Sequence, residues 1–100
     1  AFPEVYAALE QKAIDGQENP VTVIHANKFH EVQKHLALTN HQYNPQSVIF
    51  SKKTWDTLSN DEKKILQDAA SEAAKMQRQL SRDAANTALA ELKKAGMQVS

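Results

Sequence analysis

The stretch Ser59-Asn60-Asp61-Glu62-Lys63-Lys64-Ile65 opens a segment that continues to Gly96 without a glycine or a proline. Ser59 and Glu62 match the capping box, in which each side chain can accept a hydrogen bond from the other residue's backbone N–H. Glycine commonly follows a helix C-terminus. Between these ends, apolar residues recur every three or four positions, at Ile65, Ala69, Ala73, Met76, Leu80, Ala84, Ala88 and Leu92. The pattern predicts one uninterrupted helix over about residues 60–95.

The predicted helix is too long for a small compact domain. At 1.5 Å per residue it extends roughly 50 Å, whereas a compact domain of this length has a radius of gyration of about 13 Å. Either the helix spans two lobes of a larger fold, or a second copy covers its apolar stripe and forms a homodimer. The stripe is mostly alanine and offers little apolar area per residue. Met76 and Leu80 are predicted to be core residues.

The residues before this helix mix short helices with short strands. A first helix is predicted from Pro3 until Gly16 stops it, and a second over residues 21–33. Brief apolar runs at residues 35–39 and 47–51 predict strands, each joining a sheet that is completed elsewhere. Trp55 and Leu58 predict a short helical turn. The fold class is therefore α/β, and no repeat, linker or domain boundary is detectable within residues 1–100.

The turn between the first two helices, Ile14-Asp15-Gly16-Gln17-Glu18-Asn19-Pro20, is rich in polar groups. Gly16 can adopt positive φ, and Pro20 restricts Asn19 to an extended conformation. The Asn19 amide is therefore presented in a narrow range of directions, where a ligand carboxylate or hydroxyl could use it. The alternative is a turn whose Asp15 and Asn19 only satisfy nearby backbone groups.

Composition excludes several classes of function. Twelve basic and twelve acidic side chains leave no net charge, and the lysine pairs at residues 52–53, 63–64 and 93–94 are mixed with acids, so nucleic acid is not the expected partner. The absence of cysteine excludes disulfides and thiolate metal sites. The chain also lacks a Gly-x-Ser-x-Gly elbow and a glycine-rich phosphate loop, so no catalytic residue and no cofactor are predicted.

The four histidines, His25, His30, His35 and His41, raise the question of a metal site. Steps of five residues along a helix rotate the side chain by about 140°. His25 and His30 are therefore expected to point in different directions, and no metal ligand is predicted.

Four ordered blocks, at residues 1–11, 14–20, 28–36 and 39–41, resemble one known family. Phe2-Pro3-Glu4-Val5-Tyr6, Asp15-Gly16-Gln17-Glu18-Asn19-Pro20, Lys28-Phe29-His30-Glu31-Val32-Gln33-Lys34 and Thr39-Asn40-His41 are similar to motifs of the extracytoplasmic solute-binding proteins of tripartite ATP-independent periplasmic (TRAP) transporters, the DctP family. Residues 51–58 and 92–97 also match, so the resemblance covers essentially the whole chain.

The resemblance implies part of a two-lobed, periplasmic-binding-protein-like fold. It also implies that the chain is a portion of the C-terminal half of such a protein. Family members hold the ligand carboxylate with an arginine on an upstream strand, which neither Arg78 nor Arg82 matches.

The implied function is a periplasmic receptor, not an enzyme, that binds an organic acid and delivers it to a TRAP membrane permease. By resemblance, Asn19 contacts the ligand carboxylate or a neighbouring hydroxyl, Gln46 is a polar contact, and Phe2 lines the site. The alternative for Phe2, which precedes Pro3, is a hydrophobic staple at the helix entry. Tyr43 and His41 lie in the same loop as Gln46 and are further candidate ligand contacts; the alternative for each is a hydrogen-bonded loop residue. This loop is more similar to those of sugar-acid binders, such as receptors for uronates, than to those of dicarboxylate binders.

Two other classes of function are left open by the residues themselves. The first is a helical self-association module that binds no small molecule. The second is a metal-dependent hydrolase, which the histidine spacing makes the weakest of the three hypotheses.

Overall fold

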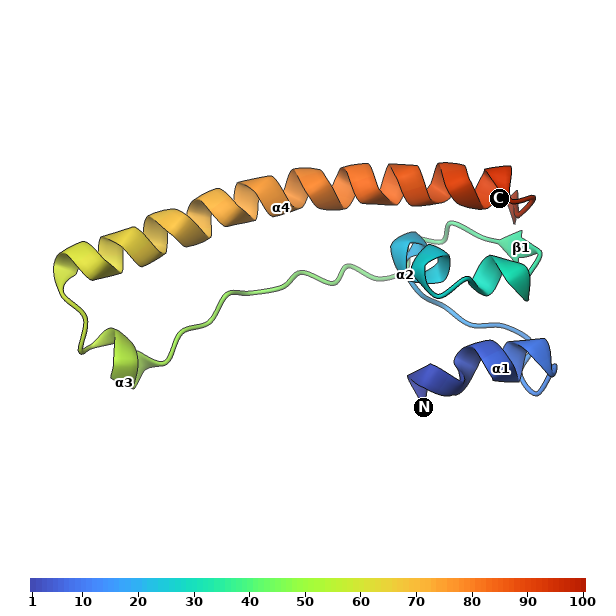
Figure 1. Cartoon of the computed structure of the whole chain (residues 1–100), viewed down its shortest axis with the longest axis horizontal. Helices are drawn as coiled ribbons and strands as arrows, with labels where there is room; N and C mark the ends of the chain where they lie inside the picture. Colours follow the sequence, from blue (N-terminus) through green and yellow to red (C-terminus); the bar gives the residue numbers. More distant parts are fainter. The chain divides into compact units, whose positions relative to one another are not determined.

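Helix α4 (Asn60–Lys94) dominates the computed structural model, which describes residues 1–100, and it is unbroken along its length (Figure 1). Its start is the predicted capping box, because the Ser59 N–H donates to the Glu62 carboxylate at 2.7 Å and the Glu62 N–H donates to Ser59 Oγ at 3.2 Å. No helix in the structure is both long enough and apolar enough to cross a membrane. The single long helix predicted from the sequence is confirmed.

The C-terminus of α4 is closed by a Schellman motif. Gly96 adopts φ of 97°, its N–H donates to the Lys93 carbonyl at 3.0 Å, and the Met97 N–H donates to the Leu92 carbonyl at 3.1 Å. Leu92 and Met97 are both buried in the same apolar cluster, which is the contact that accompanies this motif. Gly96 thus acts as the predicted helix stop.

Replacing Ser59 with alanine is expected to lower the free energy of unfolding by about 0.5–2 kcal/mol, because the Glu62 N–H loses its acceptor. Urea unfolding measures the change. Ser71→Ala is the matched control, since Ser71 is exposed in the interior of α4 and alanine is the stronger helix former there. Equal destabilisation by both substitutions would show that the hydroxyl of Ser59 does not cap the helix.

The chain divides into two compact units, of which unit 1 comprises residues 1–39 and 82–100 and unit 2 comprises residues 40–81. No glycine-rich or proline-rich linker marks these divisions in the sequence, and the second division, between residues 81 and 82, falls within α4.

In unit 1, the short 3₁₀ helix η1 (Phe2–Glu4) leads into α1 (Val5–Glu10). The helix ends earlier than predicted. Lys12 takes the left-handed conformation with φ of 57°, and the Ala13 N–H donates to the Ala8 carbonyl at 2.8 Å. Lys12 therefore occupies the position that glycine usually takes after a helix, whereas Gly16 does not have positive φ. The prediction that Gly16 ends this helix is wrong.

The second helix is also shorter than predicted. Helix α2 (Val21–Ala26) is followed by Lys28 with φ of 56° and then by the 3₁₀ helix η2 (Phe29–Glu31). This left-handed residue changes the chain direction, and the Phe29 side chain is only 2% exposed. The predicted single helix over residues 21–33 is therefore two elements, and the break places Phe29 in the core.

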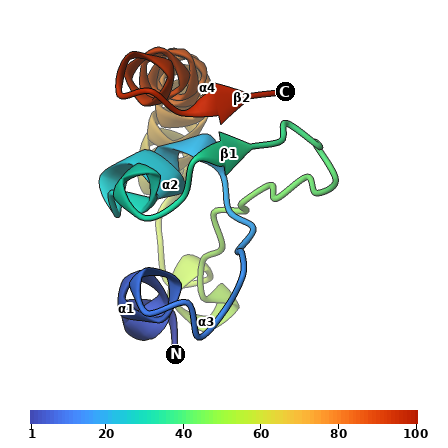
Figure 2. The ribbon, with the colours of Figure 1, turned by 90° about the vertical axis from the view of Figure 1, so that its right-hand side faces the viewer.

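Strands β1 (His35–Leu36) and β2 (Gln98–Val99) pair in parallel and lie side by side (Figure 2). The Gln98 N–H donates to the Lys34 carbonyl at 2.8 Å, and the Leu38 N–H donates to the Ser100 carbonyl at 2.8 Å. The strand predicted over residues 35–39 is confirmed only in its first two residues, and β2 was not predicted. Residues 47–51 form no strand, because a strand requires a neighbouring backbone to pair with and none pairs with them here.

The core of unit 1 is a cluster of five buried side chains from separate parts of the chain, with five partly buried side chains packed against it. The cluster contains Leu9, Ile24, Phe29, Leu92 and Met97, and the surrounding side chains are Val5, Tyr6, Val21, Val32 and Leu36. The core thus joins α1, α2, η2 and the last turns of α4.

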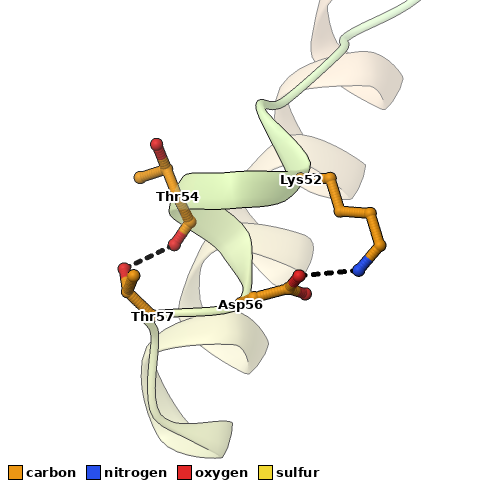
Figure 3. Close-up of polar contacts among 4 residues, drawn as sticks. All are labelled: Lys52, Thr54, Asp56 and Thr57. Carbon is orange, nitrogen blue, oxygen red and sulfur yellow. Dashed lines mark hydrogen bonds and ion pairs between the residues drawn. The ribbon is translucent and has the colours of Figure 1, made fainter.

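Unit 2 contains the first part of α4 and the short helix α3 (Lys52–Trp55), which confirms the predicted helical turn. The Lys52 ammonium bonds the Asp56 carboxylate at 2.6 Å, and the Thr57 hydroxyl donates to the Thr54 carbonyl at 2.6 Å (Figure 3). Met76 and Leu80 are 62% and 58% exposed. Within residues 1–100, these two side chains therefore do not belong to a core, and their place in the core of a larger fold stays a prediction.

Candidate functional site

Asn19 lies in the irregular segment between α1 and α2, and it is half-buried. Its Nδ2 donates to Gln17 Oε1 at 2.7 Å. The next residue, Pro20, caps α2, since its carbonyl accepts the N–H groups of Val23 at 2.9 Å and Ile24 at 3.0 Å. The helix therefore anchors the backbone immediately after Asn19, and Gln17 holds the side chain.

Phe2 lies in η1 and is 49% exposed. Its ring makes an edge-on contact with the ring of Phe29, with the centroids 6.1 Å apart and an interplanar angle of 62°. Because Phe29 is buried in the core, this contact holds the Phe2 ring while leaving about half of it accessible. An aromatic side chain held in this way can provide a wall for a ligand.

Gln46, Tyr43 and His41 lie together in the extended segment of unit 2 that precedes α3. All three are exposed, and Tyr43 is 89% exposed. The five predicted ligand-binding residues therefore fall into two groups, with Asn19 and Phe2 in unit 1 and the other three in unit 2.

A cavity of about 460 Å³ opens on the surface of unit 1, and none of the five predicted site residues lines it. Its lining combines carboxylates, a lysine and apolar side chains: Tyr6, Leu9, Glu10, Lys12, Ile14, Asp15, Glu31, Val32 and Gln33. Two of the lining residues bond to each other: the Tyr6 hydroxyl donates to the Glu31 carboxylate at 2.7 Å. No sequence pattern connects these two residues, because they are 25 positions apart.

The hydrogen bond to Glu31 raises the pKa of Tyr6 above its ordinary value of 10.0, with smaller contributions from desolvation and from the negative charges of Glu31 and Glu10. The bond requires the neutral phenol, so its stabilising effect is present below pH 10.0 and is lost as the pH rises through the higher pKa of the folded protein.

A spectroscopic titration of the phenolate, taken as the difference between the wild-type protein and Tyr6→Phe, is expected to show Tyr6 ionising above pH 10.0. In Glu31→Gln, the pKa of Tyr6 is expected to fall, because the charged acceptor is removed. An unshifted Tyr6 in the wild-type protein would contradict the observed hydrogen bond.

His25 and His30 do not diverge as predicted. Their rings stack with the centroids 6.0 Å apart and an interplanar angle of 23°, because the left-handed Lys28 breaks the helix between them. The spacing argument assumed a continuous helix and is wrong. No group of three or more potential metal-ligating side chains forms in the structure.

Residues 1–100 match the family model of bacterial extracellular solute-binding proteins, family 7. The chain belongs to this family.

Three relatives show how close the similarity is. One is a TRAP periplasmic solute-binding protein from Ochrobactrum anthropi, whose structure has the C-terminus bound in the ligand-binding pocket. It is 54% identical to this chain, with a TM-score of 0.95, and the aligned part covers 100% of this chain and 31% of the Ochrobactrum chain. A second TRAP periplasmic solute-binding protein, from Polaromonas sp. JS666 and bound to D-erythronate, is 48% identical, with a TM-score of 0.77. The aligned part covers 99% of this chain and 33% of the Polaromonas chain. The sialic acid-binding periplasmic protein SiaP of Vibrio cholerae is 54% identical over 69 residues, which are 69% of this chain and 22% of SiaP.

The chain thus spans about a third or less of the length of these relatives. The predicted family is confirmed. So is the predicted fold class, part of a two-lobed α/β fold of the periplasmic-binding-protein type with short strands and one long helix.

Proposed function

We propose that the intact protein is a periplasmic receptor that binds an organic acid and delivers it to a TRAP membrane permease, with no chemistry on the ligand. The observation that carries the proposal is the match over all 100 residues to a family of extracellular solute-binding proteins. Relatives that match this chain include a periplasmic sialic acid-binding protein and a protein bound to D-erythronate.

The ligand that we propose is a sugar acid, with a dicarboxylate as the alternative. Sialic acid and D-erythronate, which two relatives bind, both combine a carboxylate with hydroxyl groups. The side-chain amides of Asn19 and Gln46 can both donate to a carboxylate and accept from a hydroxyl. Phe2, Tyr43 and His41 complete the proposed set of ligand-binding residues, and the half-exposed ring of Phe2 can cover an apolar face of the ligand.

Isothermal titration calorimetry with a panel of acids tests the proposal. The panel contains sialic acid, glucuronate, D-erythronate, malate and succinate. At least one of the sugar acids is expected to release or absorb heat on binding and to raise the melting temperature of the protein, since a ligand that binds only the folded state stabilises it. The absence of binding to every acid would overturn the proposed function.

The second candidate function is self-association through α4. It is favoured by one observation, namely that the large apolar side chains of Ile65, Met76 and Leu80 on this helix are 67%, 62% and 58% exposed. The comparisons give it no support. Light scattering distinguishes the two candidates, because self-association predicts a concentration-dependent dimer whose melting temperature does not respond to carboxylates, whereas a receptor is stabilised by its ligand.

A further inference from the structure

Asp15 is the only aspartate in the chain that is followed by glycine. Asp15 and Gly16 are both exposed, and they lie in the irregular segment between α1 and α2. The Gly16 N–H takes part in no backbone hydrogen bond. Apart from the chain neighbours of Gly16, no atom lies within 4 Å of the position that a Cβ on this residue would occupy. The Gly16 nitrogen is therefore accessible to the adjacent carboxyl group of Asp15.

At the other four aspartates, the backbone N–H that follows is held by a hydrogen bond. The residue after Asp56 donates its N–H to the Thr54 carbonyl at 3.0 Å, and the residue after Asp61 donates its N–H to Ser59 Oγ at 3.2 Å. The remaining two lie in the interior of α4, where each N–H is donated along the helix: Asp68 and Asp83. These bonds keep the following nitrogen away from the side-chain carboxyl group, and no such bond protects the position after Asp15.

The arrangement at Asp15 allows a rearrangement of the backbone. Attack of the Gly16 nitrogen on Asp15 Cγ closes a succinimide ring: the N–Cγ bond forms, the bond between Cγ and the carboxyl hydroxyl breaks, and the hydroxyl leaves with the amide proton as water. Glycine favours this step because it has no Cβ to hinder the attacking nitrogen.

Water then opens the succinimide ring at either of its two carbonyl groups. Attack at Cγ breaks the N–Cγ bond and restores aspartate. Attack at the backbone carbonyl carbon of Asp15 breaks the original peptide bond and leaves the main chain running through Cγ, which is isoaspartate. One water is lost and one is regained, and no electron is transferred, so the chain needs no partner for this reaction.

The segment that isoaspartate lengthens is held at both of its ends. Upstream, the Ala13 N–H donates to the Ala8 carbonyl at 2.8 Å, and downstream the Pro20 carbonyl accepts the first N–H bonds of α2. Isoaspartate adds one carbon–carbon bond, about 1.5 Å, to the main chain between these points. Because both ends are held, the added length displaces the residues between them, and Asn19 is one of these.

We propose that Asp15-Gly16 is a site of spontaneous isoaspartate formation in the folded protein, and that the isomerised protein has lost its affinity for the organic acid. The first part is independent of the proposed function, because it concerns only the chemistry of this segment. The second part rests on the proposed function, because it takes Asn19 as a ligand contact.

Incubation in water enriched in heavy oxygen measures the reaction, because each opening of the ring adds one heavy oxygen atom to the residue. The intact protein is kept at mildly acidic pH, where a protonated carboxyl group loses water more readily than a carboxylate, both in the folded state and unfolded in guanidinium chloride. Peptide mapping by mass spectrometry locates the uptake, and chromatography separates the isoaspartyl peptide from the aspartyl peptide. The other four aspartates serve as internal controls.

Two variants test the roles of the two residues. Gly16→Ala places a methyl group beside the attacking nitrogen, and the structure accommodates it, because Gly16 does not have positive φ and the space around it is open. Asp15→Glu keeps the charge but requires a larger and less readily closed ring. The melting temperature of each variant shows that it is folded.

In the folded wild type, uptake at Asp15 is expected to stay within a few-fold of its rate in the unfolded protein, whereas uptake at the other four aspartates is expected to be many-fold slower than in the unfolded protein. Gly16→Ala is expected to slow uptake at Asp15 several-fold, and Asp15→Glu is expected to abolish uptake at that position. The assigned modification site is wrong if folding protects Asp15 as strongly as it protects the aspartates of α4, or if Gly16→Ala reacts as fast as the wild type.

Calorimetry on aged protein tests the effect on binding, with the tightest-binding acid of the panel as the ligand. The binding stoichiometry of the aged wild type is expected to fall by the fraction of isoaspartate, and that of Gly16→Ala aged for the same time is expected to fall several-fold less. An unchanged stoichiometry in isomerised wild type would overturn the second part alone. If fresh wild type binds no acid of the panel, the proposed function and the second part fail together, while the uptake of heavy oxygen still decides the first part.

Discussion

Replacing Leu92 with alanine is expected to lower the free energy of unfolding by about 2–5 kcal/mol, the range for deletion of a fully buried leucine side chain. Leu92 is 0% exposed and lies in the cluster that joins α1, α2 and η2 to the end of α4. Its loss leaves a cavity between elements that are far apart in the sequence. Its carbonyl also accepts the Met97 N–H of the Schellman motif, but alanine retains this backbone bond, so the effect reports side-chain packing.

Leu80→Ala is the matched control for this prediction. The substitution and the helix are the same, but the Leu80 side chain is 58% exposed. Its replacement is expected to change the free energy of unfolding by less than about 1 kcal/mol, as surface substitutions usually do. Urea unfolding of both variants gives the comparison. A similar loss in the two variants would contradict the location of the core at the C-terminal end of α4.

Replacing Asn19 with alanine is expected to weaken binding of the organic acid by about 1–3 kcal/mol, because polar groups of the ligand lose their partner inside the site. The expected loss exceeds that for any exposed loop residue of the proposed set, since Asn19 is half-buried and held on both sides by Gln17 and Pro20. Calorimetry with the tightest-binding acid of the panel measures the change.

Asn86→Ala provides the control for Asn19→Ala, because Asn86 is exposed on α4. It is expected to leave the affinity unchanged. The melting temperature of each variant without ligand separates a loss of binding from a loss of folding. Should Asn19→Ala bind the acid as tightly as the wild-type protein does, Asn19 would have to be removed from the proposed site.

Asn19, Gln46 and Phe2 are ligand-binding candidates by resemblance to the family, and Tyr43 and His41 are candidates because they lie in the same loop as Gln46. The structure adds physical context for two of the five. Asn19 is held by Gln17, and Phe2 is held by Phe29. The sequence pattern could have indicated the first pair, since two amides separated by one residue lie next to a proline. No local signal could indicate the second, because the contact depends on the break at Lys28 that places Phe29 in the core.

The sequence by itself determined α4, with both of its ends, and the family. These features depend on hydrogen bonds and spacings within a few residues, as in the Ser59–Glu62 capping box and the turn at Gly96. Only the tertiary structure decided that Lys12 and Lys28 take left-handed conformations, that His25 and His30 stack, and that β2 pairs with β1. The reason is physical: local preferences of about 1 kcal/mol or less per residue do not fix where a non-glycine residue turns left-handed, the break at Lys28 brings His25 and His30 together, and a strand forms only where another backbone lies beside it.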